Sequence, residues 1–371
     1  MTSRRSSTRP IACYETTCSA TSTSRTFATS EKQPRDEALR AQHPRRAGAR
    51  AAMRCVFMGS PEFAASALEA LIPRHEVVLV VTQPDKPAGR GGKLSAPPVK
   101  VVAERAGIPV FQPRSARPPE VAEQLRAAGA DIGVVVAYGK ILPRGVLEAF
   151  PRGCINIHGS LLPAYRGAAP IQWAVIDGHT VTGVTIMQLD EGMDTGPMLL
   201  TRELTIGPEE TAGELFARMA PVGAEAMLDA LDGLAAGTLL PRAQPVDGAS
   251  HARMLTKADG AIDFARPATA VSAHIRGVDP WPGAVAQCRG ETLKLFRARV
   301  IVDEAPSAGQ AAPGTVLAID ERGAIVACAS GAVALRELQL PARRRMAARE
   351  VAAGRAITVG DVLAPPPRET P

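Results

Sequence analysis

The sequence lacks the patterns that mark several common classes of protein. It has no internal repeat and no run of eighteen or more apolar residues, the length that a membrane-spanning helix needs. Its six cysteines form no Cys-x-x-Cys pair and most lie in apolar runs, which indicates a reducing compartment and neither a disulfide framework nor a zinc site. No Gly-x-Gly-x-x-Gly follows the first expected strand, so we do not expect a dinucleotide.

A basic balance that would suggest a nucleic-acid ligand is also missing from most of the chain. The formal charge of +6 comes entirely from residues 1–52, which hold nine arginines and Lys32 against four acidic residues. In the remainder, 33 basic residues balance 33 acidic ones. Overall basicity therefore does not predict RNA binding by the folded part, and only local patches of charge can do so.

Residues 1–52 are rich in Ser, Thr, Arg and Ala and have no periodic apolar face, so we expect a disordered or non-native extension. Three interpretations remain open: a start codon placed upstream of a true start at Met53, a transit peptide, or a basic arm. We expect a cytoplasmic protein, or an organellar one if these residues are a transit peptide.

From Met53 onward, short apolar runs alternate with amphipathic segments. Strands are expected at residues 53–58, 76–82, 109–112, 132–137, 154–157, 184–189 and 198–204. Helices are expected after Ser60, at residues 99–106 and 119–128, and from residue 208 or 209 to about residue 235. This alternation predicts an α/β fold with a Rossmann-like, mostly parallel sheet and helices on both faces, whose ligands bind beyond the carboxyl ends of the strands.

The pattern changes after a polar segment that contains two prolines, residues 237–256, which we interpret as an interdomain linker. Beyond it, one helix is expected at residues 268–276. Strands are expected at residues 284–288, 292–302, 314–319, 324–328 and 332–339, which predicts a small β-barrel. The expected organisation is a first domain over residues 53–236, a second over residues 257–363 and a tail over residues 364–371.

Two motifs of the first domain carry candidate catalytic groups. The run from Cys154 to His158 predicts a buried strand along which Asn156 and His158 project to the same side. An amide beside an imidazole can donate to a developing oxyanion while the ring holds or moves a proton. Alone this motif is weak evidence, because a histidine on a strand is more often a hydrogen-bonded structural residue. Asp194 follows in a glycine-containing loop, where it is either a solvated turn residue or a carboxylate that orients His158 and raises its pKa.

Longer stretches around these residues resemble a known family. Residues 154–173, 182–187 and 194–196 match the folate-dependent formyltransferase superfamily in order and spacing, and the chain from about residue 53 to about residue 363 is similar to methionyl-tRNA formyltransferases. The resemblance implies formyl transfer from 10-formyltetrahydrofolate to methionyl initiator tRNA, without a metal ion, with Asn156, His158 and Asp194 as catalytic residues. The folate contacts that it implies are Ser160, Leu161, Leu162, Pro163, Tyr138 and Gly139.

The resemblance also implies contacts with tRNA. The glycine-rich segment 83–94 is similar to a loop that meets the acceptor stem, and the second domain is similar to an OB-like barrel that can contact RNA. The candidate tRNA-binding residues are Lys86, Arg90, Lys93, Arg166, Arg343, Arg344 and Arg345. A solvated surface turn is the alternative for both basic clusters. Two positions depart from the family: Ala164, where a basic residue is frequent, and Phe264, where tryptophan is usual.

Two other functions remain open. Formylation of a small amine, such as glycinamide ribonucleotide or an amino sugar, is disfavoured by the full-length second domain. A non-catalytic RNA-binding or scaffold protein is disfavoured because Asn156, His158 and Asp194 are all present. We therefore expect a monomeric tRNA-formylating enzyme that does not bind a membrane.

Overall fold

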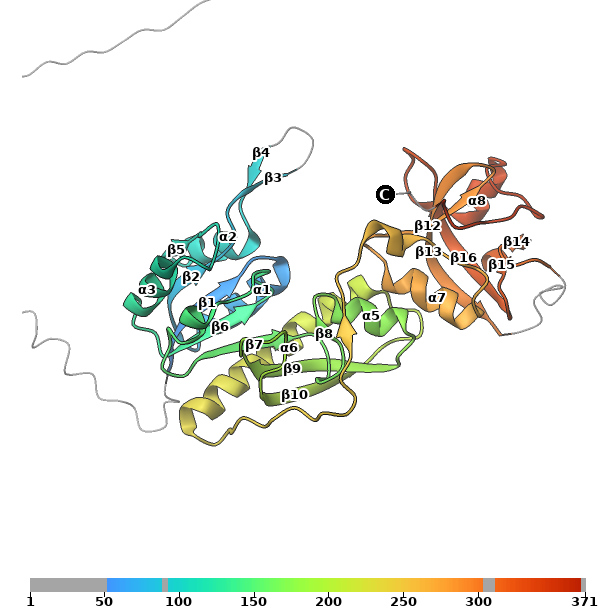
Figure 1. Ribbon diagram of the computed structural model, residues 1–371. Helices are drawn as coiled ribbons and strands as arrows, with labels where there is room; N and C mark the ends of the chain where they lie inside the picture. Colours follow the sequence, from blue (N-terminus) through green and yellow to red (C-terminus); the bar gives the residue numbers. More distant parts are fainter. Residues whose placement is uncertain (1–51, 89–92, 303–310, 368–371) are drawn as a thin grey trace, which may run out of the picture. The chain divides into compact units, whose positions relative to one another are not determined.

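The computed structural model describes residues 52–88, 93–302 and 311–367 (Figure 1). The interpretations given for residues 1–52 fall outside this part of the chain, except at Ala52, and so does the candidate Arg90. Within the described residues, none of the helices combines the length and the apolar character needed to cross a bilayer. Four of the cysteines lie there, and all of them are buried and unpaired: Cys55, Cys154, Cys288 and Cys328.

A Rossmann-like sheet organises the first domain. Over the described residues it has seven strands in the order β10-β9-β7-β6-β1-β2-β5. Their bounds are β1 (Arg54–Gly59), β2 (Glu76–Val81), β5 (Val110–Phe111), β6 (Ile132–Val136), β7 (Cys154–His158), β9 (Val181–Gln188) and β10 (Met198–Thr205). The pairs from β5 to β7 are parallel, whereas β9 is antiparallel to both of its neighbours. The predicted mostly parallel sheet is confirmed.

Helices cover both faces of this sheet because side chains alternate along buried strands. One core lies under α1 (Glu62–Leu71), α2 (Pro98–Arg105), α5 (Pro170–Ile176) and α6 (Ala212–Ala236), and it includes Ile155 and Ile157 of β7. The other core lies under α3 (Pro119–Ala127) and α4 (Arg144–Leu147), and it includes Cys154. The strand β7 therefore turns Cys154, Asn156 and His158 toward the α3 and α4 face.

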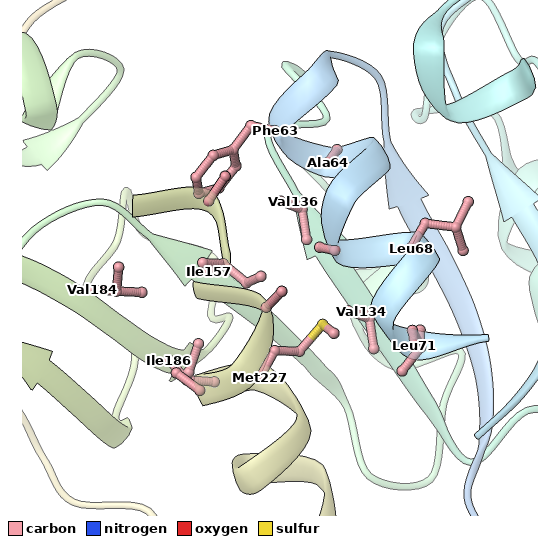
Figure 2. Packing of buried hydrophobic residues seen from close by; sticks show 14 of the residues in the cluster. Phe63, Ala64, Leu68, Leu71, Val134, Val136, Ile157, Val184, Ile186 and Met227 are labelled. Carbon is pink, nitrogen blue, oxygen red and sulfur yellow. The ribbon is translucent and has the colours of Figure 1, made fainter. Parts of the chain in front are cut away.

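The first core is closed by the contact of α1 with α6. Figure 2 shows Met227 of α6 and Leu71 of α1 near Val134 of the sheet, and both belong with Leu68 and Ile157 to one buried cluster. The helix α6 starts at a capping box formed by Thr211 and Glu214, which satisfies backbone N–H groups at its first turn. Burial of this apolar surface holds the strand that carries His158.

Over its described residues, the second domain is an antiparallel sheet with two α-helices. The strands follow the order β12-β13-β16-β15-β14, with β17 beside β16. Their bounds are β12 (Ala284–Cys288), β13 (Glu291–Ile301), β14 (Val316–Asp320), β15 (Gly323–Ala327), β16 (Ala332–Gln339) and β17 (Met346–Ala347). The helices α7 (Ala268–Gly277) and α8 (Ala348–Ala353) share its core, in which Phe264 is buried. The predicted β domain is confirmed, and its closure into an OB-like barrel stays a prediction.

Two segments that were expected to be irregular contain short strands. Within segment 83–94, β3 (Lys86–Ala88) pairs with β4 (Lys93–Ser95). Within segment 237–256, β11 (His251–Ala252) pairs with β8 (Arg166–Gly167), and Arg242 bridges to Met198. The segment between the domains is therefore bonded to the first domain at several points.

Replacement of Leu68 by alanine tests the packing of α1 in the first core. Leu68 is fully buried, so Leu68→Ala should lower the free energy of unfolding by about 2–5 kcal/mol through lost burial and a residual cavity. Urea unfolding followed by circular dichroism measures the change. The matched control Val101→Ala, at a side chain of α2 that is 53% exposed, should alter stability by less than about 0.5 kcal/mol. Equal losses in both variants would contradict the assignment of this core.

Candidate active site

The strand β7 places an amide and an imidazole at its carboxyl end. His158 is 4% exposed, and Asn156 is half-buried on the same face of the strand. Within the described residues, the amide of Asn156 makes no hydrogen bond to the protein, so both of its N–H groups are available to a ligand. The neighbouring strand supports this arrangement, since Val135 of β6 pairs with Asn156.

Two acceptors lie against the imidazole of His158. Its Nε2 is 2.9 Å from the carbonyl oxygen of Tyr165, and its Nδ1 is 3.7 Å from Oδ2 of Asp194. A carbonyl oxygen can only accept, so Nε2 carries the proton of the neutral ring and donates it to Tyr165. Nδ1 is then the basic nitrogen. The distance to Asp194 exceeds a hydrogen bond but is short enough for strong attraction between the carboxylate and a protonated ring.

The pKa of His158 is lowered from the ordinary value of 6.5. Burial is the main cause, because a charged ring loses its hydration there, while the Asp194 carboxylate and the Tyr165 carbonyl act in the opposite direction. The expectation that Asp194 raises the pKa of His158 is confirmed for the contribution of the carboxylate, but burial outweighs that contribution, so the net shift is downward. The neutral ring therefore predominates at pH 7 and can accept a proton on Nδ1.

Asp194 reaches the ring through a loop that folds back over the sheet. Because β9 is antiparallel to β7, Gln188 at the end of β9 pairs with Ile155, whereas Thr185 pairs with His158. Residues 189–197, named here the aspartate loop, therefore start at the end of β7 opposite to His158. Asp194 has a left-handed backbone with φ of 54°, and its Oδ2 accepts a hydrogen bond of 2.8 Å from the N–H of Gly167. The carboxylate of Asp194 is thus hydrogen-bonded within the protein, so Asp194 is not a solvated turn residue.

Residues 159–169, named here the histidine loop, are held by hydrogen bonds within the loop and from the neighbouring strand β9. The hydroxyl of Ser160 donates to the carbonyl of Ala164 at 2.5 Å, and the hydroxyl of Thr185 donates to the carbonyl of Ser160 at 2.7 Å. Ser160 is fully buried and Leu162 is buried, whereas Leu161 and Pro163 are partly exposed. Of the four candidate folate contacts in this loop, Leu161 and Pro163 are therefore the ones that offer surface to a ligand.

The loop after β6 forms the other side of the site. Ala137 and Gly139 are exposed and have positive φ values, and Ile141 is 78% exposed. Tyr138 is buried; its carbonyl accepts a hydrogen bond from Gln83, and burial raises the pKa of its hydroxyl to about 12. The loop thus presents backbone groups and one apolar side chain next to the end of β7, surfaces suited to a flat heterocycle.

The candidate tRNA-binding residues differ in whether their charged groups already bind other groups of the protein. Lys86 is exposed and donates to Gln83, and Arg166 donates from two nitrogens to Oε1 of Gln244. Arg345 stacks on Phe296 at 3.9 Å and pairs with Glu337. Arg343 and Arg344, just after β16, are exposed, and their guanidinium groups have no ion-pair partner among the described residues. The side chain of Lys93 lies outside the described part of the chain.

Three residues of the site were missed from the sequence: Tyr165, Gly167 and Gln244. The first two act through their backbone, and their side-chain types carry no signal of that role. Gln244 donates to the carbonyl oxygens of Asp194 and Gly196, both at 2.8 Å, from a position 50 residues beyond Asp194. Nothing in the spacing of the sequence indicates this contact.

Comparison with known protein families shows which class of enzyme this chain belongs to. The profile of the formyl transferase family matches residues 53–231, and that of the formyl transferase C-terminal domain matches residues 254–356. HypX from Aquifex aeolicus, solved in complex with tetrahydrofolic acid, is 17% identical with a TM-score of 0.56, covering 83% of this chain and 48% of its own. WlaRD, a sugar 3N-formyl transferase, is 16% identical with a TM-score of 0.58, covering 79% of this chain and 99% of its own. These two structures share the fold, and the family profiles make the protein a formyltransferase.

Relatives with higher identity define the branch within that class. A methionyl-tRNA formyltransferase of Trichlorobacter lovleyi is 46% identical over 313 residues, covering 84% of this chain and 97% of the relative. A methionyl-tRNA formyltransferase of Geobacter metallireducens is 48% identical over 305 residues, covering 82% of this chain and 96% of the relative. The chain belongs to the methionyl-tRNA formyltransferase family.

Titration of His158 tests the balance of burial and charge at the site. Because burial dominates, the ring should take up its proton with a midpoint below pH 6.5. Asp194→Asn removes the negative charge that favours the protonated ring, so it should move the midpoint to still lower pH. NMR of the imidazole carbons, assigned with His158→Ala, measures both midpoints. A midpoint above 6.5 in the wild type, or an upward shift in Asp194→Asn, would contradict this account.

Proposed function

We propose that the protein transfers the formyl group of 10-formyltetrahydrofolate to the α-amino group of methionyl initiator tRNA, with Asn156, His158 and Asp194 as its catalytic residues. Membership of the family supports the reaction. The single observation that supports the roles is the 3.7 Å approach of the Asp194 carboxylate to the Nδ1 of a buried histidine. Two motifs 36 residues apart in the sequence meet there beside the half-buried amide of Asn156.

The chemistry starts when the neutral amine attacks the formyl carbon and negative charge develops on the formyl oxygen. Asn156 has free N–H groups to donate to that oxygen. The neutral ring of His158 has no free N–H, because Nε2 is bound to Tyr165, so it acts first as a base and accepts the proton of the amine on Nδ1. Asp194 stabilises the imidazolium. The proton then passes to the nitrogen of the folate as the bond from that nitrogen to the formyl carbon breaks, which leaves formylmethionyl-tRNA and tetrahydrofolate.

The folate co-substrate fits between the histidine loop and the loop after β6. Leu161 and Pro163 on one side and the exposed backbone of Ala137 and Gly139 on the other offer apolar and polar surface. Attack on a formyl group that is already activated by its leaving nitrogen requires no metal ion, so we infer that none takes part. We also infer that the enzyme is a cytoplasmic monomer.

Contact with tRNA is assigned to residues whose charge is still free. Lys86 on the β3–β4 hairpin and the exposed pair Arg343 and Arg344 of the second domain can meet backbone phosphates. Arg345 is held by Phe296 and Glu337, so its contribution to phosphate binding should be smaller. Sugar formyltransferases share the fold at 16% identity, a likeness that carries no argument about the substrate of this chain.

Turnover of catalytic variants tests the proposed roles. Wild-type protein, incubated with 10-formyltetrahydrofolate, should formylate methionyl initiator tRNA and leave glycinamide ribonucleotide unchanged. Asn156→Ala should reduce kcat about 100-fold to 1000-fold, as expected for loss of one oxyanion donor. His158→Ala and Asp194→Asn should abolish most turnover with little change in tRNA affinity, because neither group binds the tRNA. Near-normal rates in either variant would discard these roles.

The arginine pair is tested through affinity and its dependence on salt. The double variant Arg343→Ala, Arg344→Ala should raise KM for tRNA, leave kcat unchanged, and make the slope of log affinity against log salt shallower by about one per lost phosphate contact. Arg105→Ala is the matched control, since Glu69 already neutralises Arg105. If KM and the salt slope of the double variant equal those of the control, the two arginines lie outside the tRNA interface.

A further inference from the structure

The segment between the two domains crosses the catalytic loops, and one side chain of it points inward. Residues 242–252, named here the strap, begin at Arg242, which exchanges two backbone hydrogen bonds with Met198, and end at Ala252, which pairs with Gly167. Of residues 241–251, all described, Gln244 alone is partly buried, and the others are exposed. Beside it lies a cavity of about 480 Å³ lined by Arg166, Thr195, Pro197, Ala243, Gln244, Pro245, Val246 and Ala249. Hydrogen bonds, more than apolar packing, therefore hold the strap in place.

The amide of Gln244 uses its whole hydrogen-bonding capacity. Its Nε2 donates to the carbonyl oxygens of Asp194 and Gly196 at 2.8 Å each, and its Oε1 accepts from Nε and a terminal nitrogen of Arg166 at 3.1 and 2.7 Å. The partners fix the orientation of the amide, because guanidinium groups only donate and carbonyl oxygens only accept. One side chain thus joins the aspartate loop to the histidine loop.

The backbone that Gln244 holds is strained. Asp194 has a left-handed φ of 54°, a conformation that a residue with a Cβ adopts only where its surroundings fix it. The strap also fixes the carboxylate of Asp194, because Ala252 packs on Gly167, whose N–H donates to Oδ2. A Cβ on Gly167 would come within 2.7 Å of the carbonyl oxygen of Ala252, so this approach requires glycine.

We propose that Gln244 is a positioning residue for formyl transfer, which holds the Asp194 backbone so that the carboxylate stays against His158. The inference rests on the proposed roles of His158 and Asp194. It adds Gln244, which lies on the segment that leads to the second domain, to the residues that support the catalytic group. Arg166, which is bound to Gln244, then acts in positioning as well as through its charge.

Two substitutions remove this support in different ways. Gln244→Glu keeps an acceptor for Arg166 but places an oxygen against two carbonyl oxygens, and Gln244→Met keeps the approximate shape and removes all four bonds. Both should lower kcat about tenfold to a hundredfold with KM for tRNA near the wild-type value, the effect expected of a misplaced catalytic group. Gln244→Met, which adds no charge, should also move the titration midpoint of His158 down toward that of Asp194→Asn, because the carboxylate no longer faces the ring. Asp247→Ala, an exposed change on the same strap, should leave kcat, KM and the midpoint unchanged.

The outcomes separate this inference from the function on which it rests. If Asp194→Asn loses turnover while both Gln244 variants keep wild-type kcat and Gln244→Met keeps the wild-type His158 midpoint, the inference is wrong and the catalytic roles stand. A loss of kcat in Gln244→Met while the His158 midpoint stays unchanged shows a purely structural role for Gln244 and overturns the inference. A loss of kcat that is explained by a fall in the melting temperature does the same. If Asp194→Asn keeps its turnover, the proposed catalytic roles themselves fail, whatever the Gln244 variants do.

Discussion

The proposed chemistry depends on a histidine whose pKa is lowered by burial and on one carboxylate that favours its protonated form. In water an imidazole is partly protonated near neutral pH, and a protonated ring cannot accept the proton of an attacking amine. Burial at the end of β7 keeps the ring of His158 mostly unprotonated. Asp194 stabilises the positive charge that the ring gains when it accepts the proton. In the proposed reaction, the site therefore stabilises the charged ring only after the proton has been transferred to it.

Holding the carboxylate there requires contacts from distant parts of the chain. Because β9 is antiparallel to β7, the aspartate loop starts at the end of β7 opposite to His158. The loop therefore folds back toward His158, and Asp194 adopts a left-handed backbone. Gly167 and Gln244 supply the bonds that fix it: Gln244 belongs to the strap, and Gly167 pairs with Ala252 at its end. The same segment leads into the domain proposed to bind tRNA, so substrate binding and catalytic geometry share one piece of chain.

Much of the fold could be predicted from local patterns, because alternation of apolar residues and the period of two along β7 depend on nearby residues alone. The mostly parallel sheet, the faces of β7 and the strands of the second domain follow from them. The path of the aspartate loop could not, since strand direction at the sheet edge is set by long-range pairing. The sign of the net pKa shift of His158 also required the structure, because it depends on how deeply the ring is buried. Gln244 carries no local signal, and residues 237–256 have the composition of an ordinary linker.

The central claim is that the Asp194 carboxylate stays against the imidazole of His158 when the site is occupied. A crystal structure of the protein with a bound, non-transferable folate analogue measures this most directly. The account predicts Oδ2 of Asp194 within about 4 Å of Nδ1, the range in which ion pairs form, Nε2 bonded to the carbonyl of Tyr165, and the formyl position of the analogue beside Asn156. A carboxylate turned into solvent, with the ring bonded elsewhere, would contradict it.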